Sequence, residues 1–191
     1  GLFDRAPALS PIPLEEHAKI ARDIGAAGSV LLRNEGSLLP LDTKQSMRIA
    51  LLGPWVTQAA TGGGGSSKVN PIRAVTPAEI IARRVAGTNV QLTIDATADP
   101  ATAAQLAGAA DIAVVVAGSF ETEGADRQTM ALPDGQDELI AAVAAANPRT
   151  IVFLHAGSPV LMPWVENVAA IVEGWYPGGE DGEITAALLF G

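Results

Sequence analysis

The chain has 191 residues, of which 48% are hydrophobic and 17% are charged, and its formal net charge is −9. This length suits a single domain, and the apolar fraction is high enough to bury a core, which excludes a disordered chain. The acidic balance excludes a nucleic-acid partner, because binding a phosphate backbone requires a basic face. Cysteine is absent, which excludes disulfides and thiolate metal sites and leaves the compartment open. No apolar run approaches the roughly 20 residues of a membrane-spanning helix, so we expect no membrane span.

The first half of the chain predicts helices and strands in alternation. The elements expected there, in chain order, are a linker over residues 1–13, a helix over 14–28, extended pieces at 30–32 and 38–41, a buried strand over 47–53 and a long loop over 54–75. A helix should begin after Thr76, which can cap it. Pro77 suits the first helical turn, and Glu79 completes the pattern of a capping box.

The second half continues the alternation. It predicts a strand over residues 89–94, a helix over 99–110, a strand over 112–117, a helix over 136–146 capped by Asp134, strands over 150–154 and 169–173, and a final helix over 183–190. Apolar strands that alternate with helices indicate a mostly parallel sheet covered on both faces. We therefore expect a three-layer α/β/α sandwich of about six strands, flavodoxin-like, over residues 14–191.

An acidic cluster, ETEGADR at residues 121–127, directly follows the expected strand 112–117. Ligands of open α/β sheets bind at the carboxyl ends of the strands. Glu121 and Glu123 there suit proton transfer, because a partly shielded glutamate can hold its proton near neutral pH. The alternative interpretations are a solvated turn, or a calcium site that also uses Asp126, although no EF-hand spacing is present.

The glycine run TGGGGSS at residues 61–67 has no phosphate-binding spacing. It is either a flexible surface loop or a loop whose bare backbone lets a ligand approach, with Ser66 or Ser67 as hydroxyl donors.

Other candidate positions have ordinary structural interpretations beside the functional ones. No GxSxG motif is present, and His155 at a strand end is a structural residue or a base, whereas His17 is expected on the surface. The acids at 134–138 and 178–183 precede helices, which indicates capping. Trp164 and Trp175 could stack on a sugar ring or pack in the interior.

Taken together, the chain resembles the second, α/β-sandwich domain of glycoside hydrolase family 3, which includes β-glucosidases and β-xylosidases. The matching pieces, in chain order, are HAKIARDIGAAGSVLLRNEGSLLPL (17–41), RIALLGP (48–54), GGGSS (63–67), ADIAVVVAG (110–118), ETEGADR (121–127), LPDGQDELIAAVAAANP (132–148), GSPVLMPW (157–164) and EGWYPGGEDGEITAALLFG (173–191). They follow the family's order over nearly the whole chain.

The resemblance implies a retaining exo-acting β-glycosidase in which a (β/α)₈ barrel precedes this domain and carries an aspartate nucleophile in a Ser-Asp-Trp motif. This chain has no Ser-Asp dipeptide. The resemblance also implies a partner barrel, a β-linked glycoside or oligosaccharide as substrate, and neither a cofactor nor a metal.

For individual residues, the resemblance implies Glu123 as the general acid/base, with Glu121 as the nearby alternative. Ser66, beside Gly65, matches a serine that contacts the sugar, and Asp126 and Arg127 would support the loop. Ala125 departs from the family, where an aromatic residue is common. A different class of function stays open: a non-catalytic domain that binds carbohydrate or a protein partner.

Overall fold

The computed structural model describes residues 3–4 and 11–191. Its helices and strands are α1 (Leu14–Gly28), β1 (Val30–Asn34), β2 (Met47–Leu52), α2 (Pro77–Val85), β3 (Val90–Asp95), α3 (Pro100–Gly108), β4 (Ile112–Gly118), α4 (Gln136–Ala146), β5 (Thr150–His155), β6 (Ala170–Glu173) and α5 (Asp181–Phe190). Most of the expected linker 1–13 lies outside the described residues. None of the described helices combines the length and the apolar character that crossing a membrane requires.

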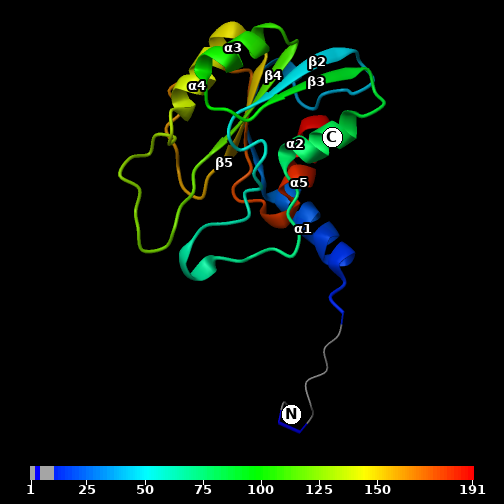
Figure 1. The fold of residues 1–191 in the computed structure, drawn as a ribbon, viewed down its shortest axis with the longest axis vertical. Helices are drawn as coiled ribbons and strands as arrows, with labels where there is room; N and C mark the ends of the chain where they lie inside the picture. Colours follow the sequence, from blue (N-terminus) through cyan, green and yellow to red (C-terminus); the bar gives the residue numbers. More distant parts are fainter. Residues whose placement is uncertain (1–2, 5–10) are drawn as a thin grey trace.

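The strands form one six-stranded sheet in the order β1-β6-β5-β4-β2-β3 (Figure 1). All neighbours pair in parallel except β1, which runs antiparallel to β6 at one edge. The prediction of a mostly parallel sheet of about six strands is therefore confirmed.

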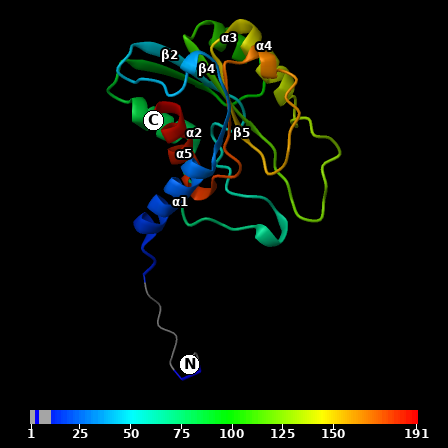
Figure 2. The same ribbon diagram turned by 180° about the vertical axis from the view of Figure 1, so that it is seen from behind.

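Two apolar cores lie on opposite faces of the sheet, because successive side chains of a strand point to opposite sides. In β4, the side chains of Ile112, Val114 and Val116 join the core beneath α2 and α5. The alternate residues, Ala113 and Val115 among them, join the core beneath α3 and α4. Figures 1 and 2 show these two helix pairs on opposite sides of the sheet, with α1 beside α5, so the three-layer arrangement is also confirmed.

Helix starts agree with the sequence at two positions and differ at a third. Thr76 and Asp99 accept hydrogen bonds from the backbone N–H groups of Glu79 and Thr102, as N-caps do. Asp134 does not cap α4. It adopts a left-handed conformation with φ of +57°, and Gly135 occupies the cap position without a side-chain bond.

The expected extended piece at residues 38–41 is not a strand. The Asn34 side chain bonds both the N–H and the carbonyl oxygen of Leu39, and Leu41 N–H donates to the carbonyl of Leu189. These backbone groups are satisfied without a neighbouring strand.

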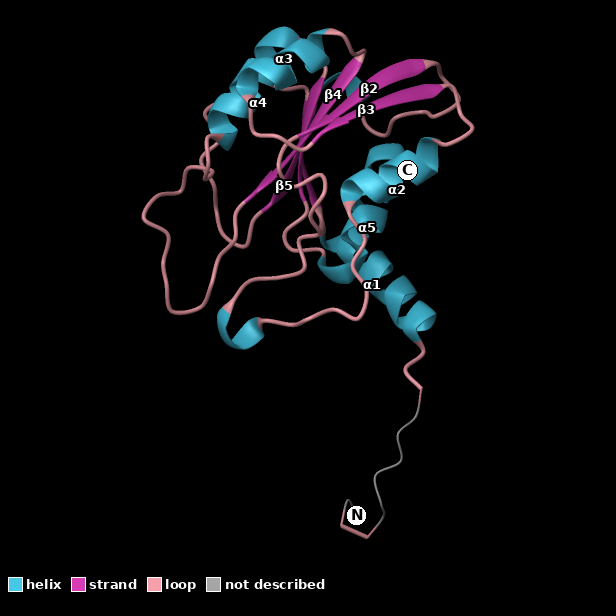
Figure 3. Cartoon of the chain, viewed as in Figure 1, coloured by secondary structure: helices cyan, strands magenta, loops and turns pink. Residues whose placement is uncertain are grey.

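The fold brings two long loops to the carboxyl end of the sheet. One follows β2 and contains the glycine run; the other follows β4 and contains the acidic cluster. Because β2 and β4 are direct neighbours although β3 lies between them in the sequence, the chain reverses its winding direction there. Figure 3 shows both loops extending past the same end of the sheet, which is where open α/β folds bind ligands.

Ionisable groups are buried at this same end of the sheet. Glu173, the last residue of β6, is 7% exposed and accepts a hydrogen bond of 2.8 Å from Trp175 N–H. Burial, reinforced by the charge of Glu121 and opposed by hydrogen bonds from Trp175 and Ala156, raises the pKa of Glu173 to about 7. Glu173 is thus neutral in the folded chain over a pH range in which an ordinary glutamate is charged.

This burial predicts a pH-dependent stability. The pKa of Glu173 is higher in the folded chain than its ordinary value of 4.5, so ionisation of Glu173 opposes folding. The stabilising contribution of protonated Glu173 is complete below the pKa of the unfolded chain. The free energy of unfolding should therefore fall as the pH rises from 4.5 toward 7, by at most about 3 kcal/mol. Urea denaturation of Glu173→Gln over this range should show a smaller fall than the parent chain. Part of the fall should remain, because burial also raises the pKa of Asp181. Exposed Glu16→Gln should keep the full fall. Equal pH profiles for Glu173→Gln and the parent chain would contradict the assignment.

Candidate functional site

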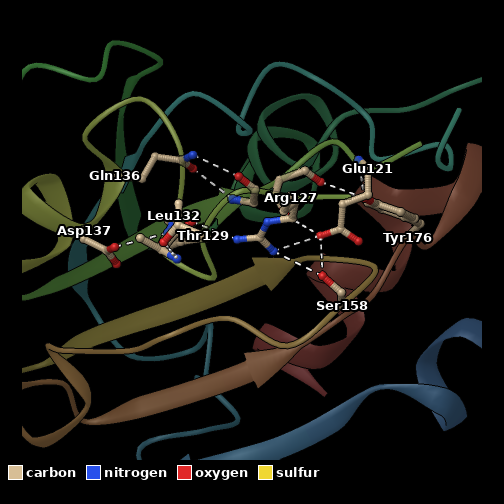
Figure 4. Close-up of polar contacts among 11 residues, drawn as sticks. Glu121, Arg127, Thr129, Leu132, Gln136, Asp137, Ser158 and Tyr176 are labelled. Carbon is tan, nitrogen blue, oxygen red and sulfur yellow. Dashed lines mark hydrogen bonds and ion pairs between the residues drawn. The ribbon is translucent and has the colours of Figure 1, made fainter. Parts of the chain in front are cut away.

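Glu121 is held in a network within the acidic loop, defined here as residues 119–127. Its Oε1 accepts hydrogen bonds from Ser119 Oγ at 2.8 Å, Ser158 Oγ at 2.9 Å and Arg127 Nη1 at 3.0 Å (Figure 4). Its side chain is only 18% exposed. An oxygen with three donors is well satisfied, so this carboxylate holds the loop in place.

Tyr176, which lies after β6, attaches the backbone of the same loop. Its hydroxyl donates to the carbonyl oxygen of Ser119 at 2.8 Å and accepts from the N–H of Glu121 at 3.1 Å (Figure 4). Burial and the adjacent Glu121 charge raise the pKa of Tyr176 above its ordinary value. The hydroxyl therefore keeps the proton that the bond to Ser119 needs.

Arg127 and Asp126 differ in their contacts. Arg127 also donates to Ser158 Oγ at 3.2 Å and to the carbonyl oxygen of Ala131 at 2.8 Å. Its guanidinium thus connects the acidic loop to the segment after β5. The Asp126 carboxylate is exposed and forms no hydrogen bond or ion pair to any residue that the structure describes.

Glu123 differs from Glu121 in its surroundings. It is exposed, and its Oε2 accepts a hydrogen bond of 2.7 Å from the backbone N–H of Ser66. Hydrogen bonding from Ser66 lowers the pKa of Glu123 below its ordinary value. The side chain is thus positioned by one contact and remains accessible to a reacting molecule.

The glycine loop, defined here as residues 61–74, packs against the acidic loop. Gly64 N–H donates to the carbonyl oxygen of Glu121 at 2.8 Å, and Gly64 forms a parallel bridge with Thr122. Gly65 has φ of +78°, and a Cβ there would overlap the Cβ of Glu123. Glycine is therefore required at position 65 both for the backbone conformation and for the close approach.

Ser66 contributes through its backbone amide in this structure. Its side chain is exposed and also interacts with the Glu123 carboxylate, and this interaction is the largest cause of the lowered pKa of Glu123.

The acids at 134–138 do not cap α4, and Asp137 has a different structural role. Asp137 accepts hydrogen bonds from the indole N–H of Trp164 at 2.8 Å and from the N–H of Leu132 at 3.2 Å. The Gln136 amide pairs with both backbone groups of Gly118, each at 2.9 Å. These contacts hold the residues on either side of the acidic loop, Gly118 before it and Leu132 after it; Figure 4 shows Leu132 beside Asp137. Trp164, only 1% exposed, is a packing residue.

The acids at 178–183 also differ from the capping prediction. The buried Glu180 carboxylate accepts from Arg22 at 2.7 Å and Arg73 at 2.8 Å, and these bonds lower its pKa although burial opposes them. The fully buried Asp181 accepts from the N–H of Ala60 at 2.8 Å. Periodicity does not reveal these contacts, because their partners are distant in the sequence.

His155 and Trp175 differ in exposure. His155 is fully buried, with Nε2 3.5 Å from Asp181 Oδ1, and its ring packs beside Trp55 and Phe153. Its burial keeps it from a substrate. Trp175 is 45% exposed, and its indole N–H donates to the carbonyl of Gly28.

The calcium alternative gains no support from the geometry. Over residues 3–4 and 11–191, no three His, Asp or Glu side chains are grouped in a way that would hold a metal ion.

Known proteins resemble the chain over most of its length. Residues 29–191 match the model of the glycosyl hydrolase family 3 C-terminal domain. Thermostable beta-glucosidase B of Acetivibrio thermocellus is 36% identical over 190 residues, covering 93% of this chain and 25% of that protein. An exo-alpha-(1->6)-L-arabinopyranosidase of Bifidobacterium longum is 30% identical, covering 93% of this chain and 26% of that enzyme. The chain thus spans about a quarter of the length of these relatives.

A solved structure agrees with these sequence matches. DesR, a beta-glucosidase from Streptomyces venezuelae in complex with D-glucose, superposes with a TM-score of 0.85 at 27% identity, covering 97% of this chain and 38% of that one. The family match, the relatives and the six-stranded α/β sandwich agree, and the chain belongs to glycosyl hydrolase family 3, of which it is a C-terminal domain.

Proposed function

We propose that this domain supplies the general acid/base of a retaining exo-acting β-glycosidase of the β-glucosidase type, and that Glu123 is that residue. The observation that carries the proposal is the contrast between the two glutamates of the acidic loop. Glu121 is bound by three donors, whereas Glu123 is exposed with a single hydrogen bond. Glu123 can therefore reach a glycosidic oxygen without breaking the support of its own loop.

The chemistry needs a second carboxylate, about 5–5.5 Å from the first in retaining enzymes. We propose that it comes from a (β/α)₈ barrel domain of the same enzyme, joined through residues 1–13. The Glu123 carboxyl donates its proton to the leaving oxygen as the barrel carboxylate attacks the anomeric carbon and the glycosidic bond breaks. The Glu123 carboxylate then takes a proton from the water that releases the sugar.

The hydrogen bond from Ser66 suits the second of these steps. It favours the ionised carboxylate, which is the form that accepts a proton from water. For the first step, a barrel domain and a bound glycoside would exclude water from Glu123 and raise its pKa. The same residue would thus serve as acid and then as base.

The substrate we propose is a β-linked glycoside or oligosaccharide. The names of two relatives, a beta-glucosidase and an arabinopyranosidase, support a glycoside as the substrate class. Ser66 and Gly65 would contact the sugar, and Arg127 would support the loop. The exposed Asp126 makes no contact among the described residues that would give it the supporting role expected from the sequence. Because one catalytic carboxyl lies outside this chain, the chain alone should have negligible activity.

Replacing the acid/base should lower the rate of hydrolysis most for substrates whose leaving group needs protonation. In the full-length enzyme, Glu123→Ala should lower kcat/KM about 10²- to 10⁴-fold for an alkyl glycoside, which needs protonation as it leaves. An aryl glycoside with an acidic phenol should be affected much less. Added azide should restore turnover of the aryl substrate and yield a β-glycosyl azide. Steady-state kinetics and product analysis measure both effects.

The matched control is Glu183→Gln, which removes a carboxylate that pairs with Arg83 of α2 and contacts neither Glu121 nor Glu123. It should keep wild-type kinetics on both substrates. Near-normal turnover of the alkyl glycoside by Glu123→Ala would reject Glu123 as the acid/base. If Glu121→Ala then also kept normal turnover, the result would favour a non-catalytic binding domain.

Gly65→Ala, a substitution in the glycine loop, should disturb Glu123 of the acidic loop. A methyl group there overlaps Glu123 Cβ, so the hydrogen bond from Ser66 should be lost and the pKa of Glu123 should rise toward its ordinary value. Carboxyl-detected NMR titration of this chain measures the change. Gly87→Ala is the matched control, because Gly87 has a similar φ of +76° and no atom within 4 Å of its Cβ position. An unchanged Glu123 titration in folded Gly65→Ala would contradict the contact.

A further inference from the structure

Both ends of the glycine loop are held by one short segment before and at the start of α5. At the first end, Gly178 N–H donates to the carbonyl oxygen of Ala60 at 3.0 Å. The N–H of Ala60 donates to Asp181 Oδ2 at 2.8 Å. Ala60 directly precedes the loop, so its two backbone bonds fix where the loop begins.

The second end of the loop is fixed by the same segment. Val75 N–H donates to the carbonyl oxygen of Gly179 at 3.0 Å, and Gly182 N–H donates to the carbonyl oxygen of Val75 at 2.9 Å. Within the loop, Arg73 pairs with the buried Glu180 at 2.8 Å. Residues 178–182 therefore hold both ends of the glycine loop.

The acidic loop is attached two residues earlier in the same segment. Tyr176 bonds the backbone of Ser119 and Glu121, as described above. One stretch of seven residues, 176–182, thus contacts both loops that meet at Glu123. Figure 4 shows Tyr176 against Glu121 on one side of this arrangement.

We propose that residues 176–182 form a clamp that sets the position of the glycine loop relative to the acidic loop, with Tyr176 and Asp181 as positioning residues for Glu123. That Glu123 is the acid/base rests on the proposed function. The geometric relation between the clamp and Glu123 does not.

The physical case for the clamp is strongest at Asp181. Its side chain is fully buried, and its Oδ1 accepts from Thr185 Oγ1 at 3.0 Å while Oδ2 accepts from Ala60. Burying a carboxylate is costly unless its oxygens are hydrogen-bonded. A residue that only capped α5 would bond N–H groups of its own helix, whereas Asp181 bonds an amide 121 residues earlier in the chain.

The composition of the loop explains why it needs such a clamp. Four consecutive glycines, 62–65, have a large backbone freedom that the folded state must restrict. The Ser66 N–H can meet Glu123 only if both loops keep their positions. Fixing both ends of one loop and the start of the other removes most of the relative movement between them.

The test is NMR of this chain with three readouts: hydrogen exchange at Ala60, the Ser66 amide shift and the Glu123 carboxyl titration. In Asp181→Ala, the rate of hydrogen exchange at the Ala60 amide should rise about tenfold or more. The amide loses its acceptor, so local opening at Ala60 becomes easier. In both Asp181→Ala and Tyr176→Phe, the Ser66 amide proton should move upfield, and the pKa of Glu123 should rise.

Conservative and control variants separate positioning from general stability. Asp181→Asn retains an oxygen for Ala60 and should recover most of the parent Ser66 shift. Glu183→Gln, two residues beyond Asp181, should leave all three readouts unchanged. If Asp181→Ala does not fold, Tyr176→Phe and Gly179→Ala decide, since a methyl group at 179 overlaps the Arg73 carbonyl oxygen.

Unchanged Ser66 shift and Glu123 titration in the folded clamp variants would overturn the clamp. In the full-length enzyme, the clamp variants should lower kcat more than they raise KM. If they alter the NMR readouts while Glu123→Ala keeps full activity, the clamp stands and the proposed function fails.

Discussion

The direct pairing of β2 with β4 is the constraint on which the candidate site depends. Neighbouring parallel strands have their carboxyl ends at the same end of the sheet. The loop after β2 and the loop after β4 therefore start side by side. The bridge between Gly64 and Thr122 and the contact from Ser66 to Glu123 follow from this adjacency. If β3 lay between β2 and β4, an additional strand spacing of about 4.8 Å would separate the two loop origins.

Two glutamates of the acidic loop, two residues apart, differ in role: Glu121 stabilises the loop, and Glu123 is accessible to solvent. Glu121 lies among Ser119, Ser158 and Arg127, and its three hydrogen bonds keep its charge well satisfied. The Glu123 side chain is exposed, and Ser66 alone positions it, through the backbone amide and the side chain. A rigid neighbour allows a reactive side chain to be exposed and still be positioned, because the supporting bonds restrict the backbone. Under the proposed function, Glu121 would therefore support the reaction and Glu123 would carry it.

The sequence predicted the fold well because its strands are nearly continuous apolar runs and its helices begin with recognisable caps, as at Thr76 and Asp99. The predictions were wrong at positions where contacts with residues distant in the sequence, or the course of the backbone, determine the role of a side chain. Aspartate is a common N-cap residue, yet Asp134 lies in a turn with a positive φ and does not cap α4. The acids 180 and 181 precede a helix, yet their partners are Arg22, Arg73 and Ala60, whose proximity depends on the complete fold. Motif order identified the acidic and glycine loops, but not how Glu121 and Glu123 differ.

Several polar groups are buried at the carboxyl end of the sheet, beneath the candidate site. Glu173, Asp181 and His155 are buried there, although apolar side chains of the same volume would be less costly to bury. Asp181 is the clearest case, since one carboxylate oxygen contacts the buried Thr185 and the other contacts Ala60, at the beginning of the glycine loop. Burial raises the pKa of Asp181, and the hydrogen bonds from Ala60 and Thr185 oppose this effect. Such bonds fix geometry more strictly than an apolar contact, because hydrogen bonds depend on direction. The core beneath the site therefore has a second role: it determines where the flexible, glycine-rich backbone above it can lie.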